Sequence, residues 1–197
     1  MPSKVTTAAK PSARERLLAA ADDLFYREGV RSVGIDRIVR QAGVAKASLH
    51  NLFGSKEELV QAYLDARHAN TREQVERALT RFRTPRERLL GVFDAQGRLF
   101  TEPGFNGCAH MTASAEAVPG SPTECAANRY RQWGRTMFTD LAREAGAADA
   151  EGLARQLHLL YDGAGVAARM DRDPSAATTA RAAAAALFDA VQAADAR

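Results

Sequence analysis

The segment IDRIVRQAGVAKASLHNLFGSKEEL, residues 35–59, is the most informative part of this 197-residue chain. Its apolar residues fall into two sets at helical spacing, Ile35, Ile38, Val39 and Ala42 followed by Val44, Leu49 and Phe53. Gly43 stands between the two sets, and glycine permits a tight turn there. The segment therefore predicts a helix-turn-helix, in which two short helices bury one face each and the second projects its other face outward.

The second helix of this pair has a small and polar outer face near its start. The residues expected on that face are Lys46, Ala47, Ser48, His50 and Asn51. Such a helix can enter the major groove of double-stranded DNA, where lysine reaches guanine acceptors, asparagine and serine bond base edges or phosphates, and alanine meets a thymine methyl. We therefore predict DNA contacts for these residues. Whether Lys46 meets a base or a phosphate stays open.

Two cations outside that helix, Arg37 and Lys56, complete the predicted DNA-binding set. Lys56 starts the next helix, so its charge adds to the helix N-terminal dipole that attracts a phosphate; the alternative is an ordinary surface lysine. Residues 1–56 hold ten Lys or Arg against five Asp or Glu, whereas the remainder holds 17 against 19. This asymmetry indicates a polyanionic partner for the N-terminal part, with a solvated basic face as the alternative.

Helix-start signals recur along the chain, and strand signals do not. A Ser or Thr followed three residues later by Glu forms a capping box, and the pairs are Ser12 with Glu15, Ser55 with Glu58, Thr84 with Glu87 and Ser121 with Glu124. The expected helices span residues 12–28, 35–42, 46–52, 56–82, 85–100, 107–116, 122–145, 150–170 and 174–194. We therefore predict an all-α fold of nine helices with no sheet.

Residues 14–59 resemble the DNA-binding domain of the TetR family. The matching residues are Leu17, Leu18, Ala20, Ala21, Leu24, Phe25, Gly29, Val30, Ile35, Ile38, Ala42, Gly43, Val44, Ser48, Leu49, Phe53, Ser55, Lys56 and Leu59. The resemblance implies that family's nine-helix plan, a homodimer on a near-palindromic operator, and release of the operator when a small-molecule effector enters the C-terminal domain. It implies a repressor with a basic arm over residues 1–11, a DNA-binding domain over 12–55 and an effector-binding and dimerisation domain over 56–197.

The chain departs from the family pattern at four positions. Members usually have Tyr where this chain has His50, and many have an aromatic residue or His where it has Leu52. His50 can still donate to a phosphate, whereas Leu52 removes a polar contact to the DNA backbone. Gly34 and Ala45 occupy positions where Ser or Thr commonly caps a helix. Because Ala is a poor cap, we expect the DNA-reading helix to be less rigid before it meets DNA.

The C-terminal part offers a mostly aromatic set of residues for a small effector. The predicted ligand-binding residues are Phe93, Gln96, Phe105, Met111, Tyr130, Trp133 and Met137. Few polar groups among large apolar ones suit an apolar or aromatic ligand. The alternative for each of them is an ordinary place in the protein core.

The last two expected helices carry apolar stripes, which the resemblance assigns to a four-helix bundle with the same helices of a second subunit. The predicted dimer-interface residues are Leu153, Leu157, Leu160, Tyr161, Ala164, Leu187 and Val191. The alternative is that these stripes form only the core of one chain. Dimerisation would bring two reading helices about 34–36 Å apart, one turn of DNA.

Other classes of protein find little support in the sequence. No segment has the pattern of a signal peptide or a membrane span, so we expect a cytoplasmic protein with its two cysteines reduced. Cys108 and His110 are too few for a structural zinc site, and we predict no metal and no cofactor. We find no nucleophile elbow and no phosphate loop, so we predict no enzyme; a small helical enzyme and a DNA-binding protein without a sensor remain the rival interpretations.

Overall fold

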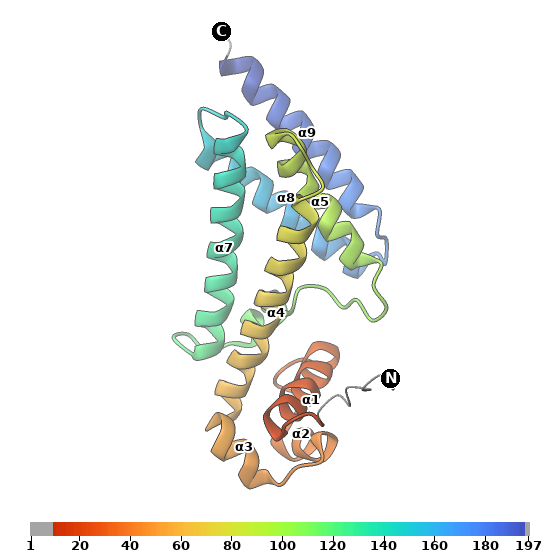
Figure 1. Ribbon diagram of the computed structural model, residues 1–197, viewed down its shortest axis with the longest axis vertical. Coiled ribbons are helices and arrows are strands. Elements are labelled where there is room, and N and C mark those ends of the chain that lie inside the picture. Colours follow the sequence, from red (N-terminus) through yellow and green to blue (C-terminus); the bar gives the residue numbers. More distant parts are fainter. Residues whose placement is uncertain (1–9, 196–197) are drawn as a thin grey trace, which may run out of the picture. The chain divides into compact units, whose positions relative to one another are not determined.

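The computed structural model describes residues 10–195, which form nine α-helices and no strand (Figure 1). The helices are α1 (Ala13–Glu28), α2 (Ile35–Ala42), α3 (Lys46–Phe53), α4 (Lys56–Leu79), α5 (Pro85–Phe100), α6 (Ala109–Glu116), α7 (Pro122–Glu144), α8 (Ala150–Met170) and α9 (Ala176–Asp195). The predicted all-α fold is confirmed for this part of the chain. Most of the predicted basic arm, including Lys4, lies outside the described residues.

Contacts between residues divide the chain into two compact units, Met1–Tyr63 (unit 1) and Leu64–Arg197 (unit 2), with the division inside α4. The helix expected over residues 56–82 ends at Leu79. It ends there because the chain tightens into shorter turns, in which the amides of Arg81 and Phe82 donate to the carbonyls of Ala78 and Leu79. The expected helices over 107–116 and 174–194 each begin two residues later than predicted, at Ala109 and Ala176.

In unit 1, α1 packs on α2 and α3. The centre of this unit is apolar, and its fully buried side chains include Leu17, Leu24, Ile38 and Leu49. The capping box predicted at the start of α1 is present. The Glu15 amide donates to Ser12 Oγ at 3.2 Å and the Ser12 amide donates to Glu15 Oε2 at 2.7 Å.

The turn between α2 and α3 depends on a left-handed glycine. Gly43 has φ +63° and ψ +43°, and its amide donates to the carbonyl of Arg40. The next amide, of Val44, donates to the carbonyl of Val39 at 3.1 Å. From α1, Arg16 Nε donates to the Ala42 carbonyl at 3.1 Å, so the end of α2 is tied both to its own turn and to α1.

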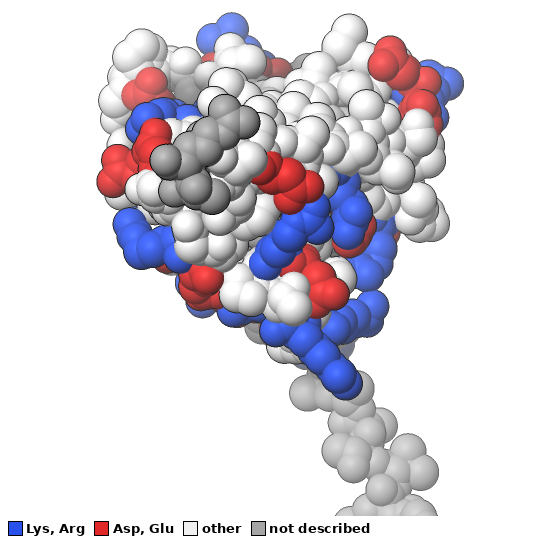
Figure 2. All heavy atoms as spheres, turned by 90° about the horizontal axis from the view of Figure 1, so that it is seen from above, with Lys and Arg blue, Asp and Glu red and all other residues white. Residues whose placement is uncertain are grey.

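In unit 2, α8 packs against both α7 and α9, and α5 packs against α7, α8 and α9. Helix α6 packs on α7 (Figure 1). Their shared core includes Phe93, Phe138, Leu157 and Phe188. Arginine and carboxylate pairs join the helices at the rim of this core, as between Arg88 of α5 and Glu144 of α7. On the face that Figure 2 draws, charges of both signs lie beside one another and uncharged side chains cover much of the rest.

A buried histidine links α6 to the part of α4 that belongs to unit 2. His110 is 4% exposed, and its Nε2 donates to the Leu64 carbonyl at 3.0 Å. Its ring stacks on Tyr130 of α7, with ring centroids 3.9 Å apart and planes 4° from parallel. Burial lowers the pKa of His110 to about 4, outweighing the bond to Leu64, which acts in the opposite direction. The imidazole is therefore neutral at pH 7.

We predict that Gly43→Ala costs about 1–2 kcal/mol of folding free energy, because a Cβ disfavours the left-handed conformation. No neighbouring atom lies within 4 Å of the position that this Cβ would take, so the cost is one of backbone conformation and not of packing. Gly43→Asn is the matched control and should cost less, since asparagine tolerates that conformation. Urea denaturation measures both. Equal losses for the two variants would contradict the backbone explanation.

We also predict a pH dependence of stability from His110. Its folded pKa of about 4 lies below the usual value of 6.5, so the stabilisation is fully present above about pH 6.5 and is lost as the pH falls toward 4. The difference corresponds to about 3 kcal/mol. His110→Phe keeps a ring for Tyr130 but cannot titrate, so its unfolding free energy should fall less steeply between pH 6.5 and 4. An unchanged slope would contradict the assignment.

Candidate functional site

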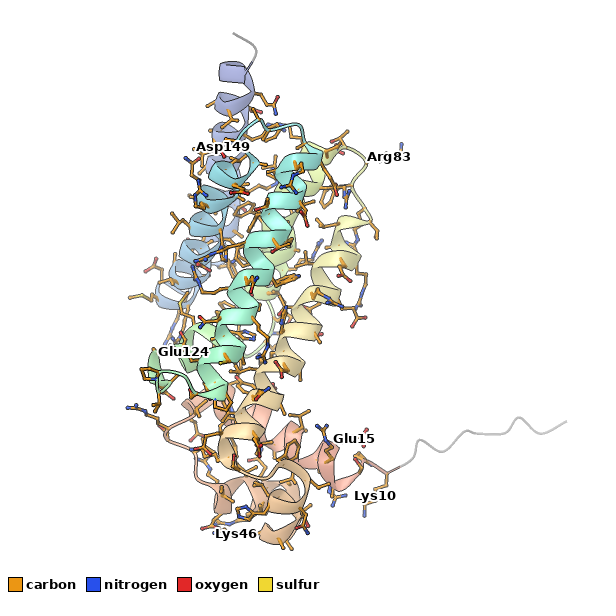
Figure 3. All side chains as sticks on the ribbon, turned by 90° about the vertical axis from the view of Figure 1, so that its left-hand side faces the viewer. Lys10, Glu15, Lys46, Arg83, Glu124 and Asp149 are labelled. Carbon is orange, nitrogen blue, oxygen red and sulfur yellow. The ribbon has the colours of Figure 1, made fainter. Side chains whose placement is uncertain are left out.

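Helix α3 presents its polar residues to solvent, as the sequence predicted for a reading helix. Lys46, Ala47, His50 and Asn51 are exposed and Ser48 is half-buried, whereas Leu49 and Phe53 on the opposite face are buried. Figure 3 shows Lys46 on the outside of the ribbon. Burial of the apolar face thus fixes which side chains of α3 can meet a partner.

The cation at the start of α3 is paired with a carboxylate of α2. Lys46 Nζ lies 2.9 Å from Asp36 Oδ1, and this hydrogen bond together with the lysine charge lowers the pKa of Asp36. The side chains are 56% and 74% exposed, respectively. A pair so open to water contributes little to stability, and Lys46 can exchange the carboxylate for a nucleic-acid group.

The ring of His50 is oriented by the loop that follows α3. Its Nδ1 donates to the Gly54 carbonyl at 3.1 Å. In the neutral ring this leaves Nε2 as an acceptor, because neutral imidazole has one N–H. The phosphate contact expected of His50 therefore requires the protonated ring, whereas an N–H or O–H donor would suit the neutral one.

The other two cations of the predicted DNA-binding set have protein partners that the sequence did not reveal. Lys56 Nζ donates to the Val30 carbonyl at 2.7 Å, which ties the start of α4 to the loop after α1. Arg37 of α2 forms a bidentate ion pair with Glu28 at the end of α1. Its Nη2 donates to Oε1 at 2.7 Å, and its Nη1 donates to Oε2. Both cations thus hold unit 1 together. An ammonium has three donors, so one contact does not prevent Lys56 from meeting a phosphate.

The residues predicted to bind a ligand lie in two neighbourhoods of unit 2. Tyr130 and Trp133 of α7 lie within ring contact of His68 of α4, at 5.5 Å and 5.2 Å between centroids. Phe93 is fully buried beside Tyr161, with ring centroids 6.3 Å apart. The other predicted members are the half-buried Phe105 and Met137 and the exposed Met111. His68 could not be predicted from the sequence, because a histidine within a polar stretch of α4 carries no periodic signal.

Gln96 of α5 has an unusual environment for a buried amide. It is 5% exposed, its Nε2 donates to the Tyr161 carbonyl at 2.8 Å, and its Oε1 has no hydrogen-bond partner in the described part of the chain. A buried acceptor without a donor is costly. Burial raises the pKa of the hydroxyls of Tyr130 and Tyr161. The polar groups in this interior are therefore uncharged at pH 7.

Most of the residues predicted for the dimer interface lie inside unit 2. Leu153, Leu157, Tyr161 and Ala164 belong to the core that α8 shares with α5, α7 and α9, and each is less than 9% exposed. Their side chains pack within one chain, as in the alternative reading of these stripes. Leu160, Leu187 and Val191 are partly buried against the same core.

A different face of α8 carries exposed apolar residues. Leu159, Val166 and Met170 are 69%, 38% and 76% exposed, and they follow one another at helical spacing. On α9, the exposed Ala182, Ala186 and Ala190 also follow one another at helical spacing. Periodicity did not find this face of α8, because apolar residues lie on several sides of that helix.

The described residues contain no group of three His, Cys, Asp or Glu side chains that could hold a metal ion. Cys108 and Cys125 are both free thiols, and burial raises the pKa of Cys108. None of the described helices combines the length and the apolar character that a membrane crossing requires.

The part of the chain that contains α3 matches a known protein family. Residues 17–63 match the model of the bacterial regulatory proteins of the tetR family. Among curated proteins, the transcriptional regulator BetI of Rhizobium meliloti is 34% identical over 83 residues, covering 42% of this chain and 41% of BetI. The transcriptional activator FasR of Mycolicibacterium smegmatis is 37% identical over 82 residues, covering 42% of this chain and 37% of FasR. These alignments span about two-fifths of each relative.

Solved structures extend the similarity to nearly the whole chain. A TetR-family transcriptional regulator from Streptomyces coelicolor is 35% identical with a TM-score of 0.85, and the match covers 91% of this chain and 95% of that protein. A putative TetR transcriptional regulator from Streptomyces avermitilis is 35% identical with a TM-score of 0.81, covering 92% and 99% of the two chains. As the sequence predicted, the chain belongs to the TetR family of DNA-binding transcriptional regulators, which are not enzymes.

Proposed function

We propose that this regulator is a homodimeric repressor that binds a near-palindromic operator and leaves it when a small, mostly apolar or aromatic effector binds unit 2. The observation that carries the proposal is the face of α3 formed by Lys46, Ala47, Ser48, His50 and Asn51 over the buried Leu49 and Phe53. A short helix that is anchored on one side and polar on the other is suited to read base edges in a major groove.

Each residue of this face has a role that its chemistry and surroundings support. Asn51 is exposed and can form two bonds to an adenine edge, so it is the proposed determinant of operator sequence. When DNA binds, Lys46 gives up its ion pair with Asp36 and contacts a guanine or a phosphate instead. Lys56 and Arg37 add charge near the DNA while holding unit 1 together through Val30 and Glu28.

The proposed dimer uses the exposed stripe of α8, residues Leu159, Val166 and Met170, together with the exposed alanines of α9. Large apolar side chains that stand in water over several helical turns are typical of an interface. Small residues on α9 allow a close approach of helices. The core residues Leu153 and Leu157 then support this surface from below and do not form it.

The proposed effector site is the aromatic interior that includes Tyr130, Trp133 and Gln96. Its groups are neutral, and Gln96 Oε1 lacks a donor, so an uncharged ligand with one N–H or O–H would fit them. Such a ligand releases the operator only to the extent that it binds better to the conformation that does not fit DNA.

We predict that Asn51→Ala changes the preferred operator, with a loss of about 1–3 kcal/mol of discrimination at the base that Asn51 contacts. Selection of bound DNA from a random library, done with the parent protein and the variant, measures this. Identical selected sequences would contradict the role of Asn51. A failure to select any sequence with the parent protein would contradict the proposed function as a whole.

We predict that Lys46→Ala weakens operator binding and, if Lys46 meets a phosphate, lowers the salt dependence of log K by about 0.9. Arg77→Ala is the matched control, since it removes one exposed cation of α4 that is paired with Glu73 and lies outside the predicted set. Binding titrations over a range of salt concentrations measure both. If the two variants bind alike, Lys46 is not at the DNA.

We predict that the double change Val166→Asp and Met170→Asp dissociates the dimer, because it buries two charges without partners in the proposed interface. Val118→Asp is the control, since Val118 is an apolar residue 65% exposed in the connection between α6 and α7. Sedimentation measures the mass, and circular dichroism confirms that both variants stay helical. A dimer that survives the double change would contradict this choice of face.

A further inference from the structure

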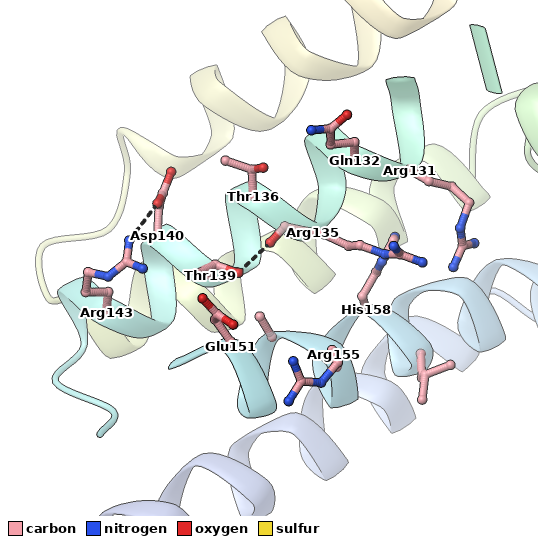
Figure 4. Close-up of a pocket in the computed structure, with 12 residues that line it drawn as sticks. Arg131, Gln132, Arg135, Thr136, Thr139, Asp140, Arg143, Glu151, Arg155 and His158 are labelled. Carbon is pink, nitrogen blue, oxygen red and sulfur yellow. Dashed lines mark hydrogen bonds and ion pairs between the residues drawn. The ribbon is translucent and has the colours of Figure 1, made fainter. Parts of the chain in front are cut away.

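A groove between α7 and α8 of unit 2 borders the proposed dimer face, since Leu159 lines it, but its charged side chains have no part in the proposed function. It has a volume of about 690 Å³, within the range of small-molecule sites (Figure 4). Four arginines line it, Arg131, Arg135 and Arg143 from α7 and Arg155 from α8. The groove is therefore a basic site on the outside of unit 2, separate from the uncharged interior around Gln96.

The positive charge of this groove is only partly neutralised. Arg131 pairs with Asp162 at 2.7 Å and Arg143 pairs with Asp140 at 3.2 Å. Arg135 and Arg155 are exposed, and neither has a carboxylate within ion-pair distance among the described residues. This holds although Glu151 lies one helical turn before Arg155 and lines the same groove. Two guanidinium groups thus remain for an external anion.

A buried histidine lines the same groove. His158 is 5% exposed, and its Nε2 is 3.7 Å from Asp162 Oδ1. It fits closely against Gly134 of α7, where a Cβ would come within 3.0 Å of Nε2. Burial lowers the pKa of His158, and the charges of Arg131 and Arg135 lower it further, against the opposite effect of Asp162. The pKa of His158 therefore depends on the charges in the groove.

We propose that this groove binds a small organic anion with at least two carboxylate or phosphate groups. Guanidinium groups bind both kinds of anion through paired N–H donors, so Arg135 and Arg155 can each hold one charged group. Thr136 and Thr139 also line the groove, and the Thr139 hydroxyl donates to the Arg135 carbonyl at 2.9 Å (Figure 4). The proposal does not depend on the DNA-binding role of unit 1.

Calorimetric titration of the full chain at one fixed ionic strength tests this proposal with three probes. These are citrate, pyrophosphate, and the neutral triamide of propane-1,2,3-tricarboxylic acid. We expect one site per chain for citrate or pyrophosphate and none for the triamide. Binding of citrate alone identifies carboxylates as the ligand chemistry, and binding of pyrophosphate alone identifies phosphates. Absence of binding by both anions overturns the proposal.

Variants connect that binding to the groove. Arg135→Gln and Arg155→Gln should each weaken the binding of the anion by about tenfold or more, the factor that 1.4 kcal/mol represents. Arg98→Gln is the matched control, since Arg98 is an exposed arginine of α5 outside the groove. It should bind as the parent does. Equal losses in all three variants would show diffuse attraction to a cationic protein and overturn the proposal.

The titration of His158 gives a second readout. A bound anion offsets the charges of Arg131 and Arg135, so the pKa of His158 followed by NMR should rise when citrate or pyrophosphate binds. The rise should be absent in Arg135→Gln at the same anion concentration. A shift that Arg135→Gln retains in full would place the anion elsewhere.

Discussion

The proposed DNA-reading face of this protein depends on the burial of Leu49 and Phe53 on the opposite side of α3. Both side chains lie in the core of unit 1, at 0% and 8% exposure, and their place on the helix leaves Lys46, Ala47 and Asn51 in solvent. A rotation of α3 by one residue, about 100°, would bury polar side chains and expose the apolar ones. The left-handed turn at Gly43 sets the direction in which this helix leaves α2.

The contacts that hold the site in place differ in strength from those that it offers to a partner. Apolar burial fixes the helices of unit 1, together with the hydrogen bonds that the side chains of Arg16 and Lys56 donate to the carbonyls of Ala42 and Val30. The pair between Lys46 and Asp36 is open to water and can be replaced at little cost. In unit 2, the pair of Arg143 with Asp140 is likewise open to water and that of Arg131 with Asp162 is partly buried, whereas Arg135 and Arg155 are left for other groups. In both units, a tightly packed apolar core thus supports exposed charged side chains that can change partners.

Local signals explain why much of the fold could be predicted from the sequence. The capping boxes at Ser12 and Thr84 both form with the expected partners, because the cap and its Glu are only three residues apart in the sequence. At Ser121 only half of the box is present: the Glu124 amide donates to Ser121 Oγ, but the Glu124 carboxylate accepts from the Gly120 amide. Ala45, the poor cap expected before α3, supplies no side-chain bond, and neither does Gly34 before α2.

Properties that depend on distant parts of the chain could not be predicted in this way. The carbonyl of Val30 that meets Lys56 is set by how α1, α2 and α4 pack, and no spacing in the sequence marks it. The stack of His110 on Tyr130 likewise joins α6 to α7. Helix α8 is apolar on several sides, so its hydrophobic pattern alone did not reveal that Leu157 faces the core and Leu159 faces water.

The central claim, that α3 reads DNA, is tested most directly by photo-crosslinking. A photoreactive amino acid at Ala47, which is exposed on the reading face, is irradiated in complex with selected operator DNA. We expect crosslinks to bases in two clusters about one helical turn of DNA apart, one from each subunit. Crosslinks from the same probe at Val118 but none from Ala47 would contradict it.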